Sequence, residues 1–160
     1  MELSWQQPFK FLPGPFDNMG AMVNYTYVVS SVLYYLSSGT ATTPATQIHD
    51  QFLNVSPHSV NATLYYEDSE LSARVSVAYR DEYLTALPFK SEVPDANGSY
   101  ATTNVDASIS YQLTPHFKLT ADALNLTNQE ADQWSGKERR SQRVFSTTGR
   151  QFFFGGAYVF

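Results

Sequence analysis

The feature that most constrains this chain is the alternation of apolar and polar residues at every second position along most of its length. Successive side chains of a β-strand point to opposite faces, so this period predicts strands with one apolar and one polar face. A helical period is not convincing anywhere. Seven segments alternate in this way, at residues 2–6, 23–36, 58–67, 71–80, 104–113, 117–125 and 152–160. The sequence therefore predicts an all-β fold of about seven strands.

Short turns and long polar loops alternate strictly between these segments. The short turns centre on 12–15, 68–69 and 114–115, and the long loops cover 37–57, 85–99 and 128–148. Alternate connections of an antiparallel up-and-down meander lie at the same end of the sheet. One rim would therefore carry the short turns and the other the long loops. Outer-membrane β-barrels have this asymmetry. The alternation slips in phase at Leu124 and Leu126, which predicts a β-bulge there.

The two faces of the predicted strands favour a membrane barrel over a soluble sheet. The polar face carries mainly Ser, Thr, Asn, Asp, Gln and Arg, which suits a water-filled lumen better than a solvent-exposed soluble surface. No apolar run approaches the roughly 18 residues that a spanning helix needs, so any membrane role must use strands. We expect the convex, lipid-facing side of the meander to carry Val75, Val77, Ile109 and Leu119.

Several classes of function are disfavoured by the composition. The net charge is −5 and the basic residues are scattered except around 137–143, so no nucleic-acid surface is expected. The absence of cysteine removes thiol catalysis and cysteine-based zinc sites. His49, His58 and His116 lack the spacing of a metal site. The acidic residues at 67–70 lie in a predicted turn, where a solvated cluster is the ordinary explanation, so we expect no catalytic constellation. We also expect no cofactor.

Several motifs resemble the late barrel strands of TonB-dependent outer-membrane receptors, most closely the proteobacterial branch associated with glycan uptake. They lie at residues 2–9, 12–15, 61–68, 73–81, 124–128 and 149–160, so the resemblance covers essentially the whole chain. It implies that residues 1–160 are the C-terminal segment, strands 16 to 22, of a plugged 22-stranded barrel. The N-terminal plug, its energy-coupling box and the earlier strands would be absent. The C-terminus would be periplasmic and the long loops extracellular.

The resemblance also implies the function and the partners. A TonB-dependent receptor of the outer membrane takes up a large scarce nutrient, and we expect an oligosaccharide rather than a ferric siderophore. The expected partners are outer-membrane lipid, the missing plug and strands, the TonB energy-coupling machinery acting through that plug, the barrel-assembly machinery and the nutrient. No enzymatic activity is expected. A soluble carbohydrate-binding β-sandwich that uses the same aromatic residues is the alternative from another class.

Two groups of residues are candidates for function. In the long loops, aromatic rings could stack on a sugar face and arginines could bind an acidic ligand, although a solvated loop is the ordinary alternative. These loop candidates are Trp134, Asp132, Arg139, Arg140, Arg143, Phe89 and Tyr100. The final strand resembles the signal that the barrel-assembly machinery reads. Its candidate residues are Phe152, Phe154, Tyr158 and Phe160.

Overall fold

The computed structural model describes residues 1–88, 95–136 and 141–160. Within these ranges the chain forms strands and one short 3-10 helix. In chain order they are β1 (Glu2–Pro8), η1 (Gly14–Asn18), β2 (Met19–Tyr27), β3 (Val32–Ser37), β4 (Thr46–Asp50), β5 (His58–Glu67), β6 (Leu71–Arg80), β7 (Tyr83–Ala86), β8 (Asn97–Ser99), β9 (Thr102–Thr114), β10 (Phe117–Leu124), β11 (Gln133–Ser135), β12 (Ser141–Val144) and β13 (Gln151–Tyr158). No helix in the described ranges is long and apolar enough to cross a membrane.

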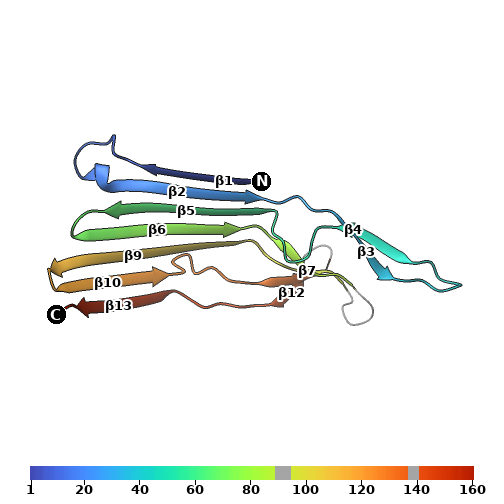
Figure 1. The fold of residues 1–160 in the computed structure, drawn as a ribbon. Coiled ribbons are helices and arrows are strands. Elements are labelled where there is room, and N and C mark those ends of the chain that lie inside the picture. The colour runs from blue at the N-terminus through green and yellow to red at the C-terminus, as the bar shows by residue number, and fades with distance from the viewer. Residues whose placement is uncertain (89–94, 137–140) are drawn as a thin grey trace.

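Seven strands form one antiparallel sheet in the order β1-β2-β5-β6-β9-β10-β13, which we call the wall (Figure 1). Each strand pairs with the wall strands that precede and follow it in the sequence, so the predicted seven-stranded up-and-down meander is confirmed. The turns β1–β2, β5–β6 and β9–β10 lie at one end of the wall together with the C-terminus (Figure 1). The other end carries the remaining strands, as the alternation of short and long connections predicts.

The apolar residues of the wall share one exposed face. Val75 pairs with Leu64 and Ala107 on its neighbouring strands, and Ile109 pairs with Ala73 and Ala121. Because directly paired residues point to the same side of a sheet, these side chains form one apolar surface. Val75, Val77, Ile109 and Leu119 are 46%, 36%, 47% and 42% exposed, so they do not fill a core between two packed sheets. The β-sandwich arrangement is therefore wrong for the wall.

The opposite face of the wall is polar. Arg74 pairs with Ser108, and Ser108 pairs in turn with Asp122, so cationic, hydroxyl and anionic groups follow one another across three strands. Asp106 lies next to this row and uses its carboxylate oxygen Oδ1 to accept a hydrogen bond from the backbone N–H of Asn125 at 2.8 Å. This is the face that the sequence predicts to line a lumen.

The prediction of one strand over 23–36 is wrong. β2 ends at Tyr27, which pairs with His58, and residues 32–37 belong to the separate hairpin β3–β4. The backbone N–H of Val28 still donates to the carbonyl of Pro57 at 2.9 Å. Proline has no backbone N–H and cannot donate the reciprocal hydrogen bond of the ladder, so the pairing of the two strands stops at this point.

The three connections predicted as long loops are also more ordered than expected. Each contains a hairpin or part of one, namely β3–β4, β7–β8 and β11–β12, and we call these the rim hairpins. The predicted bulge at Leu124 and Leu126 is wrong as well. β10 ends at Leu124 and the next residue, Asn125, turns the chain with a φ of 55°. The register shift between β9 and β10 lies instead between Phe117 and Lys118.

Asp68 organises the tight turn between β5 and β6. Its Oδ1 accepts hydrogen bonds from the backbone N–H groups of Glu70 at 2.8 Å and Leu71 at 2.7 Å. The Tyr66 hydroxyl donates to Oδ2 at 2.5 Å. The Tyr66 hydroxyl, followed by the backbone of Leu71 and of Glu70, lowers the pKa of Asp68 below its ordinary value of 3.8. All of these bonds favour the ionised carboxylate.

This turn is expected to weaken in acid. Because the pKa of Asp68 is lower in the folded protein, its stabilisation is present above the unfolded pKa and is lost as the pH falls through the folded pKa. Below about pH 4, we expect the unfolding temperature of Asp68→Asn to depend less on pH than that of the parent protein. Thermal unfolding in detergent micelles across this range tests it, with Glu70→Gln as the control in the same turn. Parallel pH profiles for the parent and Asp68→Asn would contradict it.

Candidate ligand-binding site

The hairpin β7–β8 extends the wall strands β6 and β9 without a change of register. Arg80 pairs with Thr102 at the end of the wall, and Tyr83 pairs with Ser99 three residues further along both strands. Leu84 and Gly98 are the next pair, and Gly98 also pairs with Trp134 of β11. Side chains paired in this way share a face, so Leu84 and Trp134 lie on the side of the sheet that is polar in the wall.

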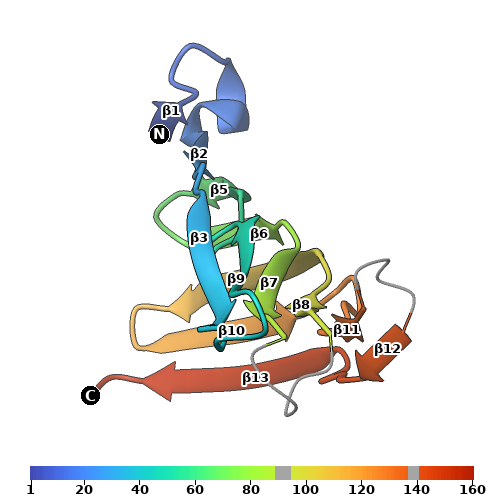
Figure 2. The same cartoon turned by 90° about the vertical axis from the view of Figure 1, so that its right-hand side faces the viewer.

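A small apolar core holds the rim hairpins together. Leu87, Trp134 and Ala96 are 0%, 2% and 8% exposed. The partly buried residues packed against them come from several hairpins and are Tyr34, Leu36, Ile48, Leu53, Leu84 and Tyr100. Gly98 is required beneath Trp134, because a Cβ at this position would overlap the indole ring and the Tyr83 carbonyl. Figure 2 views the molecule from this end, where β3 and β7 lie in front of the wall.

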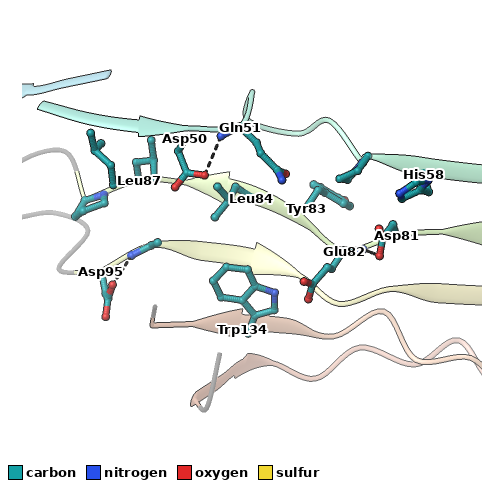
Figure 3. Close-up of a pocket in the computed structure, with 14 residues that line it drawn as sticks. Asp50, Gln51, His58, Asp81, Glu82, Tyr83, Leu84, Leu87, Asp95 and Trp134 are labelled. Carbon is teal, nitrogen blue, oxygen red and sulfur yellow. Dashed lines mark hydrogen bonds between the residues drawn. The ribbon is translucent and has the colours of Figure 1, made fainter. Parts of the chain in front are cut away.

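A cavity of about 400 Å³ lies beside this core (Figure 3). Its polar lining is supplied by four carboxylates and one amide, together with the aromatic rings of His58, Tyr83 and Trp134. The carboxylates and the amide are Asp50, Asp81, Glu82, Asp95 and Gln51, and the remaining lining is Ile48, Pro57, Leu84, Leu87, Pro88 and Ala96. These residues come from β4, β5, β7 and β11 and from the segments that flank them, so only the fold brings them together.

Hydrogen bonds within the chain orient three of the four carboxylates of the cavity. Asp50 accepts from the N–H of Gln51 at 2.8 Å, the bond drawn in Figure 3, and Asp95 accepts from the N–H of Ala96 at 2.7 Å. Asp81 accepts from the N–H of Glu82 at 2.9 Å and from the Tyr79 hydroxyl at 3.2 Å. Each of these bonds uses Oδ1 of the aspartate. These three aspartates are therefore oriented by the chain itself before any ligand arrives.

The aromatic residues are held as well. The Nδ1 atom of His58 lies 2.7 Å from the Tyr25 hydroxyl, and the His58 ring stacks on Tyr27 with 4.8 Å between centroids. The Arg80 guanidinium lies 3.9 Å from the centroid of the Tyr83 ring. A cation over a ring in this geometry is attracted to the π electrons and limits rotation of the ring. Both rings are therefore positioned before a ligand binds.

This combination of groups suits a polyhydroxylated ligand. Carboxylates accept hydrogen bonds from hydroxyl groups, and an amide both accepts and donates them. Aromatic and aliphatic side chains cover the apolar faces of a small molecule. Among the described residues, no group of three or more His, Asp or Glu side chains could hold a metal ion. The arrangement can bind and orient a ligand through hydrogen bonds and ring contacts.

The loop candidates named from the sequence divide into several environments. Trp134 lines the cavity but is 2% exposed, so most of its ring belongs to the apolar core. The carboxylate of Asp132 accepts from Gln142 Nε2 at 2.6 Å and from the N–H of Ser146 at 3.2 Å. Tyr100 packs against the core, and Arg143 is exposed on β12. Phe89, Arg139 and Arg140 lie outside the described residues. Ligand contact by this set stays a prediction.

Most residues of the cavity could not be recognised from the sequence. Asp50, Gln51 and Asp81 each stand at or just after the end of a strand, where polar residues are common. Their proximity depends on how the hairpins β3–β4 and β7–β8 pack on each other. A pattern of period two describes one strand at a time and contains no information about that packing.

The final strand was predicted to reach Phe160, but β13 ends at Tyr158, so Phe160 lies beyond the strand. The candidates within β13 lie on the apolar face of the wall. Phe152 pairs with Ala123 and Phe154 pairs with Ala121, which belong to that face. The rings of Tyr158 and Phe160 meet edge to face with 5.3 Å between centroids. Phe154 is 83% exposed, and Phe160 has no cover from the rest of the chain. The final strand therefore presents an aromatic surface that the described protein leaves uncovered.

Comparison with known proteins decides the family. Residues 1–126 match the family model described as TonB dependent receptor-like, beta-barrel. The chain belongs to this family. No curated protein and no solved structure gives a match. The receptor is therefore a β-barrel protein of the bacterial outer membrane that functions in TonB-dependent uptake, and its family is one of transporters and receptors rather than enzymes. The match extends from β1 to the end of β10, so it includes most of the wall and two of the rim hairpins.

Proposed function

We propose that this TonB-dependent receptor imports an oligosaccharide, and that the cavity beside the rim-hairpin core forms part of the ligand site. The lining of the cavity is the observation that carries the proposal. Four carboxylates and an amide surround a space with aromatic and aliphatic sides, and none of the described lining residues is Lys or Arg. Neutral hydroxyl groups bind well in such surroundings, whereas an anionic ligand would be repelled by the carboxylates.

A ferric siderophore is the second candidate ligand. The basic residues near 137–143 favour an acidic ligand, and Arg143 is exposed on β12. Arginine binds carboxylates and other anions through paired hydrogen bonds, which would suit an acidic iron chelate. The cavity and the basic cluster thus favour different ligands. We prefer the sugar because the cavity is formed by oriented groups from several hairpins.

The wall requires further strands to close. Within the described residues β1 pairs only with β2 and β13 pairs only with β10, so one edge of each is open. A strand edge cannot remain unpaired in the hydrocarbon region of a membrane, because its polar backbone groups would be desolvated. We therefore propose that residues 1–160 are the C-terminal segment of a larger, plugged barrel. TonB would act on that receptor through its plug.

The orientation follows from the two rims. Bacterial outer-membrane barrels have short periplasmic turns and longer extracellular loops. The rim hairpins and the cavity would then face the outside of the cell, and the C-terminus would lie in the periplasm. Phe152, Phe154, Tyr158 and Phe160 would meet the barrel-assembly machinery there. The exposed apolar face of the wall would contact outer-membrane lipid.

Uptake by cells that produce the whole receptor tests the sugar proposal. Asp50→Ala removes a carboxylate of the cavity, and Asp122→Ala is the control because Asp122 lies on the polar face of the wall outside the cavity. The probes are a labelled maltooligosaccharide, a labelled chitooligosaccharide and a ferric siderophore. A hydrogen bond to a charged group contributes about 1.5–3 kcal/mol, so Asp50→Ala should raise the half-saturating sugar concentration by about tenfold to a hundredfold.

Two outcomes would overturn the proposal. Uptake of the siderophore without uptake of either sugar would show that the ligand class is wrong. Equal effects of Asp50→Ala and Asp122→Ala on sugar uptake would show that the cavity is not the place where the sugar binds.

A further inference from the structure

The side chain of Asn125 makes several hydrogen bonds outside the cavity. It follows β10 immediately, is 8% exposed and has a φ of 55°. Its Nδ2 donates to the carbonyl of Gln129 at 3.2 Å and to the carbonyl of Gly149 at 3.1 Å, and it lies 3.4 Å from Thr148 Oγ1. Its Oδ1 accepts from the N–H of Gln129 at 2.6 Å. One amide therefore joins residues that precede β11 to residues that follow β12.

The same turn is tied to the wall. The N–H of Asn125 donates to Asp106 Oδ1 at 2.8 Å, and the N–H of Leu126 donates to the carbonyl of Val105 at 2.7 Å. The carbonyl of Leu126 accepts from Nε of Arg150, just before β13, at 2.9 Å. The side chain of Asn125 thus holds the base of the β11–β12 hairpin on a turn that is itself bonded to β9 and to the segment entering β13.

The base of this hairpin determines where Trp134 lies. Beyond Asn125, an isolated bridge joins Glu130 to Thr147, and the N–H of Ala131 donates to the carbonyl of Ser146 at 2.8 Å. β11 then pairs with β8, which places Trp134 against Gly98 and beside the cavity. These contacts form a series that leads from Asn125 to the indole ring. A displacement at the base would therefore move a side of the cavity.

We propose that Asn125 is a positioning residue of the ligand site, which holds the β11–β12 hairpin at the height where Trp134 completes the cavity. The residue type fits this role, because a side-chain amide offers two N–H donors for carbonyl groups and an oxygen acceptor for an N–H. Asparagine also tolerates positive φ better than other residues except glycine. The effect of Asn125 on ligand affinity rests on the proposed function, whereas its effect on the hairpin does not.

The test uses three variants of the whole receptor in outer-membrane vesicles. Asn125→Gly removes the side chain but keeps a residue that adopts positive φ, so the turn itself should survive. Asn125→Asp keeps the acceptor and removes the donors. Asn128→Gly is the matched control, because Asn128 has a φ of 52° in the same turn and is exposed. The measurements are amide hydrogen exchange and the uptake of the labelled maltooligosaccharide and chitooligosaccharide.

Both Asn125 variants should increase amide exchange in β11, β12 and residues 145–149 by about tenfold or more, since each loses several hydrogen bonds. Exchange in β5 and β6 should not change. The half-saturating sugar concentration should rise by about tenfold, while the uptake rate at saturation and the amount of receptor stay near those of the parent. Asn128→Gly should resemble the parent in every measurement.

The hydrogen-exchange result is independent of the ligand. Unchanged exchange in β11 and β12 of Asn125→Gly would overturn the proposal. Increased exchange with unchanged half-saturation for an imported sugar would overturn the link to the ligand site. Absence of sugar uptake by the parent receptor would instead count against the proposed function, and it would leave the hairpin measurement to decide the role of Asn125.

Discussion

Deletion of Phe160 is expected to remove most of the receptor from the outer membrane, whereas Tyr111→Ala should lower its level only modestly. Phe160 is uncovered in the structure, so its packing against the rest of the chain contributes little to stability. Tyr111 lies on the apolar face of the wall and pairs with Leu71 and Leu119. Full burial of such a side chain in an apolar environment stabilises by about 1.5–3 kcal/mol. An energetic role alone therefore predicts the smaller effect at Phe160.

A role of Phe160 in assembly predicts the larger loss of receptor for the Phe160 deletion, whereas packing alone predicts the larger loss for Tyr111→Ala. The comparison therefore distinguishes the two roles. Quantitative immunoblotting of outer-membrane fractions from cells producing the whole receptor measures the level of each variant. Phe160→Tyr is the control, because it preserves an aromatic ring at the end of the final strand. A smaller loss for the Phe160 deletion than for Tyr111→Ala would show that the residue has no role in assembly.

Leu87→Ala is expected to cause the largest loss of stability in the rim hairpins. Leu87 is completely buried, and it packs with Ala96 and Trp134 where the hairpins meet. Replacing a buried leucine by alanine costs about 2–5 kcal/mol, because the side chain leaves a cavity as well as losing apolar contacts. The core that holds the rim hairpins is small, so this loss should open them locally. Sugar uptake should fall with it.

The control for Leu87→Ala is Leu113→Ala. Leu113 lies on the apolar face of the wall and is 53% exposed, so lipid can fill the space left by its side chain. Hydrogen exchange of the receptor in vesicles should show faster exchange in β7, β8 and β11 for Leu87→Ala, with no change in β5 or β6. Equal exchange in the two variants would contradict the presence of a separate rim-hairpin core.

Much of the wall could be predicted from the sequence because its signal is local. A residue such as Val75 lies on the apolar face because strands alternate their side chains, whichever strands become its neighbours. The order of short and long connections likewise predicts which ends of the strands lie together. The prediction was wrong where a neighbouring strand decided the outcome. Pro57, which immediately precedes the partner strand β5, ends the β2 ladder at a point where the alternation that follows β2 continues.

The candidate site was predicted far less well, because its residues are brought together by packing between hairpins. Trp134 was expected as an exposed ring for a sugar, and its neighbours at Leu87 and Gly98 make it mainly a core residue. Asp132 was expected to contact ligand, and its carboxylate holds Gln142 and Ser146. In both cases the residue type is compatible with two roles. The structure shows the contacts within the chain, and contact with a ligand stays a prediction.

The sequence alone was enough to predict the strands of the wall, their two faces and the contrast between the two rims. Each of these depends on residues a few positions apart, so it is visible as a period of two or as a run of polar residues. Three other features emerge only in the folded protein: the polar loops form hairpins, these hairpins share a core at Leu87, and Asn125 joins Gln129 to Gly149. Those features depend on contacts between residues far apart in the chain. The type of a polar residue and its local sequence do not indicate which distant residue it will bond.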